Sequence, residues 1–302
     1  MEKQSFGKGV FFAVSAYLVW GLLPLYWKSL DAINPVHILG YRILFSAVVV
    51  GGILLAGKNT SWLKFYKNKQ KRILMILTAL AISLNWGLYI YAINSGHTID
   101  SSLGYYINPL ISIVLGMIFF REKLKILQVI AFCLAAAGVL IITILTHRVP
   151  LVSLSLAFSF AFYGLLKKIT GLPALESLGI ETLVSSPLGV LLLFVSFGAN
   201  GSVRFPDPQG FSYWALLPVS TLLLLLLCGF FSSLPLFLFS KSANMLPLST
   251  LGFCQFLSPT MTFLTGYFVF GESFPAHNFI AFGFIWGAVI LYIVSLRTPT
   301  GK

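Results

Sequence analysis

Charged residues are scarce in this sequence, and acidic ones are the scarcest. Only 9% of the 302 residues are charged, with eight Asp and Glu against twenty Lys and Arg. An ordinary soluble domain carries about 25% charged residues. Because so few charges cannot cover a soluble core of this size, the composition excludes a soluble globular protein. Hydrophobic residues make up 58% of the chain, so the expected solvent of most side chains is lipid.

Cysteine is nearly as rare, with three residues, Cys133, Cys228 and Cys254. All three lie in apolar segments without the spacing of a metal site, so we interpret them as small core residues rather than disulfide partners or metal ligands. The sequence also has no Walker phosphate-binding motif and no cluster of His, Cys and Asp. We therefore expect no metal, no cofactor and no ATP-driven transport by this chain alone.

Long apolar runs fill most of the chain. A helix needs about 20 mostly apolar residues to cross about 30 Å of hydrocarbon. The alternation typical of a membrane β-barrel strand is absent, since runs such as Leu222 to Leu227 are apolar on every face. We predict an all-α membrane protein with ten transmembrane helices, at residues 8–27, 36–56, 73–93, 101–120, 126–146, 150–168, 177–197, 214–239, 247–270 and 277–296.

The net charge of +12 could indicate nucleic-acid binding, but the basic residues concentrate beside the predicted spans. With the N-terminus in the cytoplasm, sixteen Lys and Arg fall on the inside and three, Lys28, Arg148 and Arg204, on the outside. The positive-inside rule then predicts cytoplasmic N- and C-termini. The segment from Lys64 to Arg72 interleaves aromatic and basic residues, as a segment against anionic lipid does. We expect membrane lipids, and no nucleic acid, as partners.

An internal repeat divides the chain. Residues 94–140 align with residues 244–290 at a shift of 150 without a gap, and the stretch LGYR at 39–42 pairs more weakly with LGIE at 178–181. Identical prolines, glycines and glutamates align: Pro109 with Pro259, Gly116 with Gly266, and Glu122 with Glu272. A repeat of this length predicts two structural halves.

We predict one five-helix half in residues 1–147 and a second in residues 148–302. Because five is odd, the second half enters the membrane inverted, and its copy of each cytoplasmic loop faces outside. This inversion explains why the basic residues of REK (121–123) become Gly and Ser in GES (271–273) while the Glu remains. Two inverted repeats are typical of secondary transporters.

Polar and aromatic side chains gather within several predicted spans. A buried amide without a partner costs several kcal/mol in lipid, so the amides are expected to face the bundle interior. They can orient a solute in a central cavity with aromatic walls, or they can hold helices together, and the sequence leaves both open. The candidate pathway residues are Trp20, Asn85, Trp86, Tyr89, Tyr105, Asn108, Tyr163, Gln255 and Ser258. Tyr17 and Tyr106 rank lower, because Tyr near a helix end often anchors it at the membrane interface.

Two charges, Arg42 and Glu181, lie within predicted spans, where ionisable residues are functional candidates. They align across the repeat with opposite sign, but their depths differ by roughly 15 Å at 1.5 Å per residue, so we expect no direct contact. The expected partners are Asp31 or Asp100 for Arg42, and Lys167 or Lys168 for Glu181. Each pair can gate one side of the cavity or serve as a structural ion pair.

Two further features repeat between the halves. Proline frees a backbone carbonyl and can kink a membrane helix, so the equivalent Pro109 and Pro259 are candidate hinges. Glu122 and Glu272, at the ends of spans, are expected to terminate helices or pair with neighbours. Glu181 is the acid placed well inside a span, which makes protons a candidate coupling ion.

Several stretches resemble one known family. The segment NWGLYIYAINSGHTIDSSLGYYINPLISIVLGMIFFREKL (85–124) is similar to the central signature of the RarD branch of the EamA family, in the drug/metabolite transporter superfamily. WGLLPLYWK (20–28), FYGLLKK (162–168), LGIET (178–182) and TLGFCQFLSPTMTF (250–263) resemble its other characteristic stretches. The resemblance covers nearly the whole chain. It implies ten helices in the bacterial inner membrane and carriage of a small solute, such as a metabolite, amino acid or drug, by export.

The sequence therefore predicts a secondary-active carrier that works by alternating access. One alternative is a flippase for a lipid-linked substrate, which needs a lateral opening and a charged headgroup site. A second is an intramembrane enzyme, which needs a catalytic group at membrane depth; since Asp31 and Asp100 fall outside the membrane, we expect no enzyme. A third is a non-transporting membrane protein.

Overall fold

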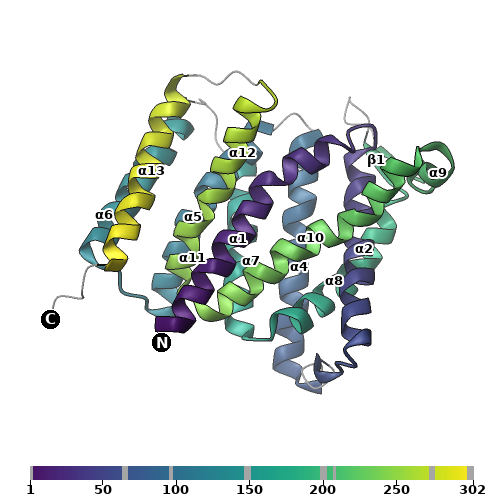
Figure 1. Ribbon diagram of the computed structural model, residues 1–302, viewed down its shortest axis with the longest axis horizontal. Helices are drawn as coiled ribbons and strands as arrows, with labels where there is room; N and C mark the ends of the chain where they lie inside the picture. The colour runs from purple at the N-terminus through teal and green to yellow at the C-terminus, as the bar shows by residue number, and fades with distance from the viewer. Residues whose placement is uncertain are drawn as a thin grey trace.

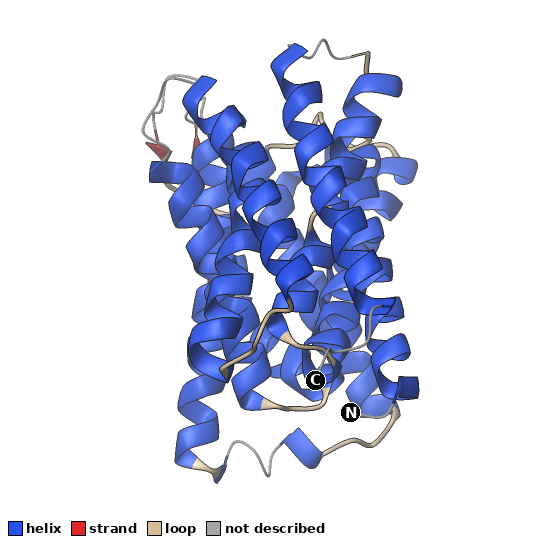
Figure 2. Ribbon diagram, turned by 90° about the vertical axis from the view of Figure 1, so that its left-hand side faces the viewer, coloured by secondary structure: helices blue, strands red, loops and turns tan. Residues whose placement is uncertain are grey.

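The computed structural model describes residues 3–62, 67–94, 98–145, 151–197, 203–206, 209–271 and 276–297. The chain forms a bundle of long, roughly aligned helices (Figures 1 and 2). The helices are α1 (Lys3–Lys28), α2 (Pro35–Ala56), α4 (Lys69–Asn94), α5 (Thr98–Phe120), α6 (Ile126–Leu145), α7 (Leu151–Thr170), α8 (Ala174–Leu192), α9 (Gln209–Leu216), α10 (Val219–Met245), α11 (Leu248–Gln255), α12 (Leu257–Phe268) and α13 (Ala276–Arg297). Two short antiparallel strands, β1 (Ser196–Phe197) and β2 (Val203–Arg204), join α8 to α9.

The outer surface of the bundle is apolar. Within the described residues, nine helices are long and apolar enough to cross a membrane. Large hydrophobic side chains remain exposed on them, among them Leu140 at 56%, Ile144 at 65% and Ile290 at 57%. Exposed apolar surface on this scale would cause aggregation in water but is suited to lipid. The predicted class, an all-α membrane protein, is confirmed.

Three of the predicted spans differ most from the structure. The span expected at 177–197 is α8, which begins at Ala174 and ends at Leu192, and residues 196–197 form β1 instead. Proline explains the other two. The span expected at 247–270 is divided into α11 and α12, because Pro259 has no N–H and its ring clashes with the carbonyl four residues earlier, at Gln255, where α11 ends. The span expected at 214–239 instead occupies 219–245, because Pro218 begins α10 and separates it from α9. The count of ten spans stays a prediction.

The helices pair across the chain rather than with sequence neighbours alone. α1 packs against α10, α11 and α12, and α2 packs against α8 and α10. α7 packs against α4 and α5, α5 also packs against α11, and α8 also packs against α4. α6 and α13 pack against each other at one edge of the bundle (Figure 1). The middle of the bundle is thus formed by helices from both parts of the chain.

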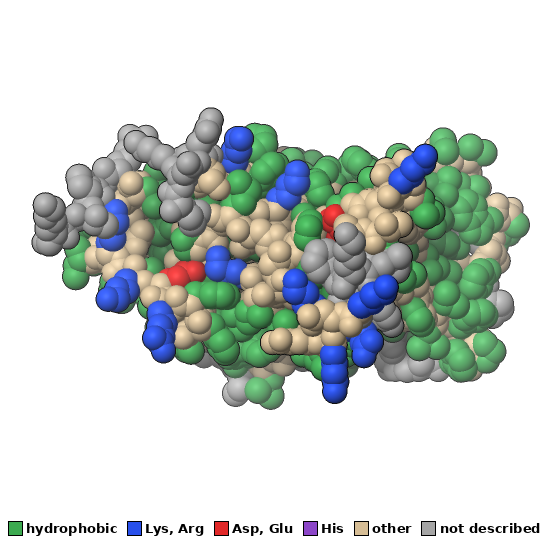
Figure 3. All heavy atoms as spheres, turned by 90° about the horizontal axis from the view of Figure 1, so that it is seen from below, with side chains coloured by type: hydrophobic (Ala, Val, Ile, Leu, Met, Phe, Trp, Pro, Cys, Tyr) green, Lys and Arg blue, Asp and Glu red, His purple; other side chains and the backbone are tan. Residues whose placement is uncertain are grey.

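The start of α1 and the end of α13 lie at the same end of the bundle, which we call the terminal face (Figure 1). Seen from that side, basic side chains are spread over the surface (Figure 3). Lys58, Lys67, Lys69, Arg121 and Lys123 are exposed there, beside the ends of α2, α4 and α5. The opposite face carries β1, β2 and α9. Among the described residues outside the helices, Arg204 is the basic residue of that face.

Both α5 and α12 are followed by a residue with left-handed backbone geometry, Arg121 at φ 52° and Gly271 at φ 66°. These positions are equivalent in the repeat. The turn after α5 brings the Glu122 carboxylate onto the start of α11, where its two oxygens accept hydrogen bonds from the backbone N–H groups of Leu248 (2.7 Å) and Ser249 (2.8 Å). No α11 side chain supplies such a cap. Glu122 therefore stabilises a helix start, as carboxylates do, while Glu272 lies outside the described residues.

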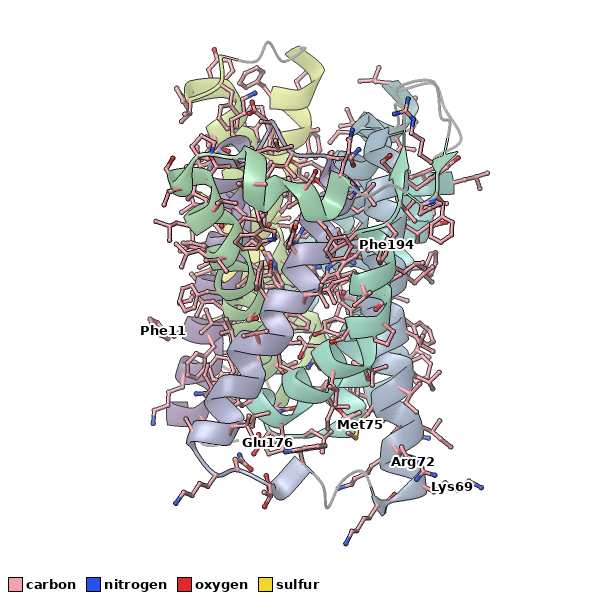
Figure 4. All side chains as sticks on the ribbon, turned by 90° about the vertical axis from the view of Figure 1, so that its right-hand side faces the viewer. Phe11, Lys69, Arg72, Met75, Glu176 and Phe194 are labelled. Atoms are coloured by element: carbon pink, nitrogen blue, oxygen red, sulfur yellow. The ribbon has the colours of Figure 1, made fainter. Side chains whose placement is uncertain are left out.

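A second acid fixes the connection that follows α2. Glu176, in the first turn of α8, accepts hydrogen bonds from Asn59 Nδ2 (2.8 Å) and Ser61 Oγ (3.0 Å). Figure 4 shows Glu176 at the lower end of the bundle, at the same level as Met75 and above Lys69 and Arg72. This contact holds the α2 connection against α8 at the terminal face.

Candidate functional site

A buried charge network joins α7 to α8 on the terminal side of the bundle. Lys167 Nζ lies 2.6 Å from Glu181 Oε1, and their side chains are 1% and 4% exposed. Ser177 Oγ accepts from Lys167 Nζ (2.8 Å) and donates to Glu181 Oε1 (3.0 Å). The Tyr163 hydroxyl donates to Glu181 Oε2 (3.1 Å). Both carboxylate oxygens are thus hydrogen-bonded, which a buried charge requires. The predicted pairing of Glu181 with one of two lysines is confirmed for Lys167.

The neighbouring lysine has a different partner. Lys168 Nζ donates to the carbonyl of Leu246, and it lies 5.3 Å from the centre of the Phe120 ring. Consecutive residues on a helix point about 100° apart, so only one of the two lysines can face Glu181.

A small cavity lies beside Glu181, with a volume of about 10 Å³, enough for one water molecule. Its lining includes Trp86 of α4, Ser185 of α8 and Leu236 of α10. The Trp86 ring also lies 5.8 Å from the Arg42 guanidinium, so Trp86 neighbours both the Glu181 cavity and Arg42. Among the described residues, Glu181 pairs with Lys167 and Arg42 with Ser232, so the two charges make no direct contact, as their predicted depths require.

Arg42 lies seven residues into α2, about 10 Å from the opposite face. Its Nε donates to Ser232 Oγ of α10 (3.0 Å), and its guanidinium lies 4.5 Å from the centre of the Trp27 ring. The expected pairing with Asp31 is wrong, because Asp31 pairs with Lys28 (3.3 Å), one helical turn away in sequence. The alternative partner, Asp100, has a side chain outside the described residues.

Two tyrosines complete the surroundings of Arg42. The rings of Tyr89 (α4) and Tyr105 (α5) lie 6.1 Å apart, and both are close enough to interact with the Arg42 charge. Tyr105 is 40% exposed, so it keeps a large accessible surface beside Arg42. Here the structure brings together three of the predicted pathway residues, Trp86, Tyr89 and Tyr105.

An aromatic cluster packs in the interior of the bundle, and Trp86 packs against the same core. Phe239 of α10 stacks on Tyr163 (5.8 Å between ring centres) and also contacts Trp20 (5.8 Å). Phe160 of α7 contacts Trp20 (5.7 Å) and Phe239 (5.7 Å). The rings belong to one core cluster with Tyr17. These rings join α1, α7 and α10 in the interior of the bundle.

The expectation that Tyr17 and Tyr106 are interfacial anchors is wrong. Tyr17 is 1% exposed and contacts Trp20 and Phe239, and no partner is found for its hydroxyl within the described structure. Tyr106 is 8% exposed, and its hydroxyl donates to the carbonyl of Pro259 (3.2 Å). Tyr17 lies eleven residues before the end of α1, and Tyr106 lies eight residues after the start of α5.

The predicted amides connect helices. Asn85 Nδ2 donates to the Leu156 carbonyl (3.0 Å) and to Ser159 Oγ (2.9 Å) of α7. Asn108 Nδ2 donates to the Ala157 carbonyl (2.9 Å), and Asn108 Oδ1 accepts from Gln255 Nε2 of α11. Of the two roles that the sequence left open, these contacts favour the packing role for all three.

The remaining predicted residues lie at contacts between helices. Ser258 is half-buried in α12, and its carbonyl faces Gly21 of α1, where a Cβ atom would approach it to 2.9 Å. Pro109 lies inside a continuous α5, whereas Pro259 follows the break between α11 and α12. The two prolines therefore have different local structures, and their role as hinges stays a prediction.

Trp27, Ser177 and Ser232 were not singled out from the sequence, although they contact Arg42 and Glu181. Ser177 had a detectable signal, since it precedes Glu181 by one helical turn on the same face. Ser232 had none, because it is 190 residues from Arg42 and meets it only through the packing of α2 on α10.

Comparison with known proteins gives a consistent result. Residues 7–144 match the model of the EamA-like transporter family. The chain is 39% identical over 299 residues to the uncharacterized transporter YojE of Bacillus subtilis, covering 98% of this chain and 96% of that protein. It is 36% identical over 295 residues to the protein RarD of Escherichia coli, covering 97% and 96%. One solved crystal structure matches with a TM-score of 0.71 at 15% identity, covering 97% of this chain and all of that one, which indicates the same fold.

Proposed function

The chain belongs to the RarD branch of the EamA-like transporter family, and from that membership we propose that it is a secondary-active carrier that exports a small solute by alternating access. Its family relatives and its apolar helices make it a multi-pass transporter of the bacterial inner membrane. The proposed solute is a metabolite, an amino acid or a drug-like compound. The proposed mechanism involves no catalytic step.

The contact between α2 and α8 carries the proposal of two inverted halves. A Cβ atom on Gly40 would approach Leu193 Cδ2 to 2.8 Å, and one on Gly179 would approach Leu54 Cδ1 to 2.5 Å. The sequence repeat pairs Gly40 with Gly179 at a shift of 139, and the same shift pairs Leu54 with Leu193. The two contacts are thus equivalent under exchange of the halves, as an inverted repeat requires.

The wider packing follows the same exchange. If α1, α2, α4, α5 and α6 correspond in order to α7, α8, α10, α11–α12 and α13, the α1–α10 pair becomes the α7–α4 pair. The contact of α1 with α11 and α12 becomes that of α7 with α5, and both are observed. The pairs α2–α8, α5–α11 and α6–α13 map onto themselves. This agreement supports halves at residues 1–147 and 148–302.

We propose that the bundle is closed toward the terminal face in this conformation. The Lys167–Glu181 pair, with Tyr163 and Phe239 of the aromatic cluster, lies toward the terminal ends of its helices and is buried. Arg42 and Tyr105, toward the opposite face, are half-buried and 40% exposed. Alternating access would open the first region and close the second. The basic residues of the terminal face support its placement in the cytoplasm by the positive-inside rule.

Protons are the proposed coupling ion. Glu181 is a buried acid within a described helix and carries Lys167, Ser177 and Tyr163 as partners. Protonation of its carboxylate would remove the charge that holds Lys167. Solute flux in proteoliposomes should then depend on a pH gradient, and it should lose that dependence in the Glu181→Gln variant.

A paired metabolite profile of cells and medium, with this protein deleted or overproduced, tests the proposed function. Reciprocal movement of one solute between the two compartments supports a carrier and gives its direction. A change confined to a lipid-linked species would favour a flippase. If nothing moves although the protein is inserted in the membrane, the transport proposal fails.

Replacing Tyr105 with Ala should lower solute flux at least tenfold while the folded yield stays normal, because we propose that this side chain, which is 40% exposed, lines the solute pathway. Flux in proteoliposomes and the folded yield after purification are the two readouts. Phe119→Ala is the matched control, since Phe119 is an aromatic residue of the same helix and is 54% exposed.

Asn85→Ala should behave in the opposite way. It removes hydrogen bonds to Leu156 and Ser159, so it should destabilise the fold by about 1–3 kcal/mol. Normal stability with lost flux in this variant would contradict the packing role and restore Asn85 to the pathway.

A further inference from the structure

Arg42 is a cation within the bundle whose charge is not balanced by a described carboxylate. Of the eight acidic residues, the structure describes the side chains of four. Asp31 pairs with Lys28, Glu181 pairs with Lys167, Glu122 caps α11, and Glu176 binds Asn59 and Ser61. Every described acid is therefore engaged elsewhere.

The guanidinium of Arg42 is only partly used. Arginine has five N–H donors in a planar fork. The Nε–H donates to Ser232 Oγ, and among the described residues no acceptor is found for the terminal nitrogens. Arg42 is half-buried. The bond to Ser232 fixes the side chain and leaves its outer edge, the one that binds planar oxyanions with two parallel hydrogen bonds, available.

Aromatic rings lie next to the Arg42 guanidinium. The ring of Trp27 from α1 lies 4.5 Å from the guanidinium, and Trp86 from α4 lies 5.8 Å from it. Tyr89 and Tyr105 form a second pair of rings, 6.1 Å apart, and Tyr105 is 40% exposed. Such rings favour a flat, apolar ligand, which they contact by stacking or edge-to-face packing.

We propose that Arg42 binds the carboxylate of the transported solute, and that Trp27, Trp86, Tyr89 and Tyr105 enclose a flat apolar body attached to it. This assignment rests on the proposed function, since it names the class of solute that the carrier takes. A singly charged carboxylate matches the single charge of Arg42. A doubly charged phosphate would leave an unbalanced charge in a region of low dielectric constant, at a high cost.

Binding of a matched pair of probes to the purified full chain in detergent tests this assignment. Phenylacetate and phenylacetamide have the same shape and differ in charge. Tritiated phenylacetate, benzoate and indole-3-acetate are measured for saturable binding, with the corresponding amides as competitors. At least one acid should bind, and its amide should compete at least about tenfold more weakly, as expected for loss of a charge-assisted hydrogen bond.

The Arg42→Gln variant should bind the acid no better than the amide, and Arg42→Lys, which keeps the charge without the fork, should fall in between. Lys28→Gln is the matched control, because it removes one positive charge from an exposed ion pair near the same face. The assignment is overturned if no acid binds, if acid and amide bind equally, or if Arg42→Gln keeps the preference for the acid.

Flux measurements separate this assignment from the proposed function. If only neutral or cationic solutes cross the membrane of proteoliposomes, and Arg42→Gln leaves that flux unchanged, the proposed carrier function is supported and the carboxylate site is contradicted. If acids bind through Arg42 but no solute crosses the membrane, the carboxylate site is supported and the proposed carrier function is contradicted.

Discussion

Replacing Lys167 with Met is expected to destabilise the bundle by about 3–5 kcal/mol, one of the largest effects of a single substitution in this chain. The change leaves the Glu181 carboxylate without its cation, although the Glu181 side chain is only 4% exposed. The Ser177 and Tyr163 hydroxyls still donate to it, but neither is charged. The expected result is a loss of folded protein in detergent, measured as the free energy of unfolding or the midpoint of thermal unfolding.

The double variant Lys167→Met with Glu181→Leu should recover most of that loss, because removing both partners leaves no buried charge unpaired. Lys28→Met is the control, since Lys28 and Asp31 are 65% and 63% exposed and such pairs contribute less than about 1 kcal/mol. A Lys167→Met variant as stable as the native chain would show that the buried pair does not hold the fold.

The double variant also separates a structural pair from a gate. Lys167 and Glu181 link α7 to α8. Both helices also pack against α4 and α10, while α7 alone packs against α5 and α8 alone packs against α2. If the link must break for the terminal side to open, the refolded double variant should transport with an altered rate or direction bias. If it transports as the native chain does, the pair is structural.

The class of fold could be predicted from the sequence, because lipid requires each spanning segment to satisfy its own backbone and to be apolar along its length. For this reason the predicted span at 126–146 agrees with α6 to within one residue. The break at Phe256 could not be predicted in the same way. Pro109 and Pro259 are equivalent in sequence, yet α5 continues and α11 stops, so the surroundings of each proline decide whether its helix breaks.

The partners of buried charges could be predicted only when they were near in sequence. Glu181 meets Lys167 because a three-residue connection folds α8 back beside the end of α7. Arg42 meets Trp27, Trp86 and Ser232, which come from three other helices. No local pattern reports such contacts. The amides show the same limit, since a buried Asn is equally compatible with a solute and with a helix until its acceptor is known.

Replacing Gly229 with Ala should disrupt the contact between α2 and α10, at a cost of about 3 kcal/mol, at the upper end for an overpacked site. A Cβ atom there would lie 2.3 Å from the backbone carbonyl carbon of Phe45 and 2.5 Å from its oxygen. Backbone atoms cannot rotate away as a side chain can, so the two helices must separate. Small residues at such crossings let membrane helices approach closely.

The separation should reach the Arg42 site. Ser46 Oγ donates to the Gly229 carbonyl (3.2 Å), and Ser232, the residue bonded to Arg42, lies one helical turn further along α10. Moving α10 away from α2 therefore pulls Ser232 from Arg42 and frees the guanidinium to change orientation. Gly229→Ala should lower both the thermal stability and the affinity for phenylacetate.

The matched control is Gly52→Ala, in α2, where no atom lies within 4 Å of the added Cβ and a better helix former should be neutral or slightly stabilising. Native stability in Gly229→Ala would mean that the two helices are not in close contact. Lost stability with unchanged phenylacetate binding would mean that Ser232 does not position Arg42.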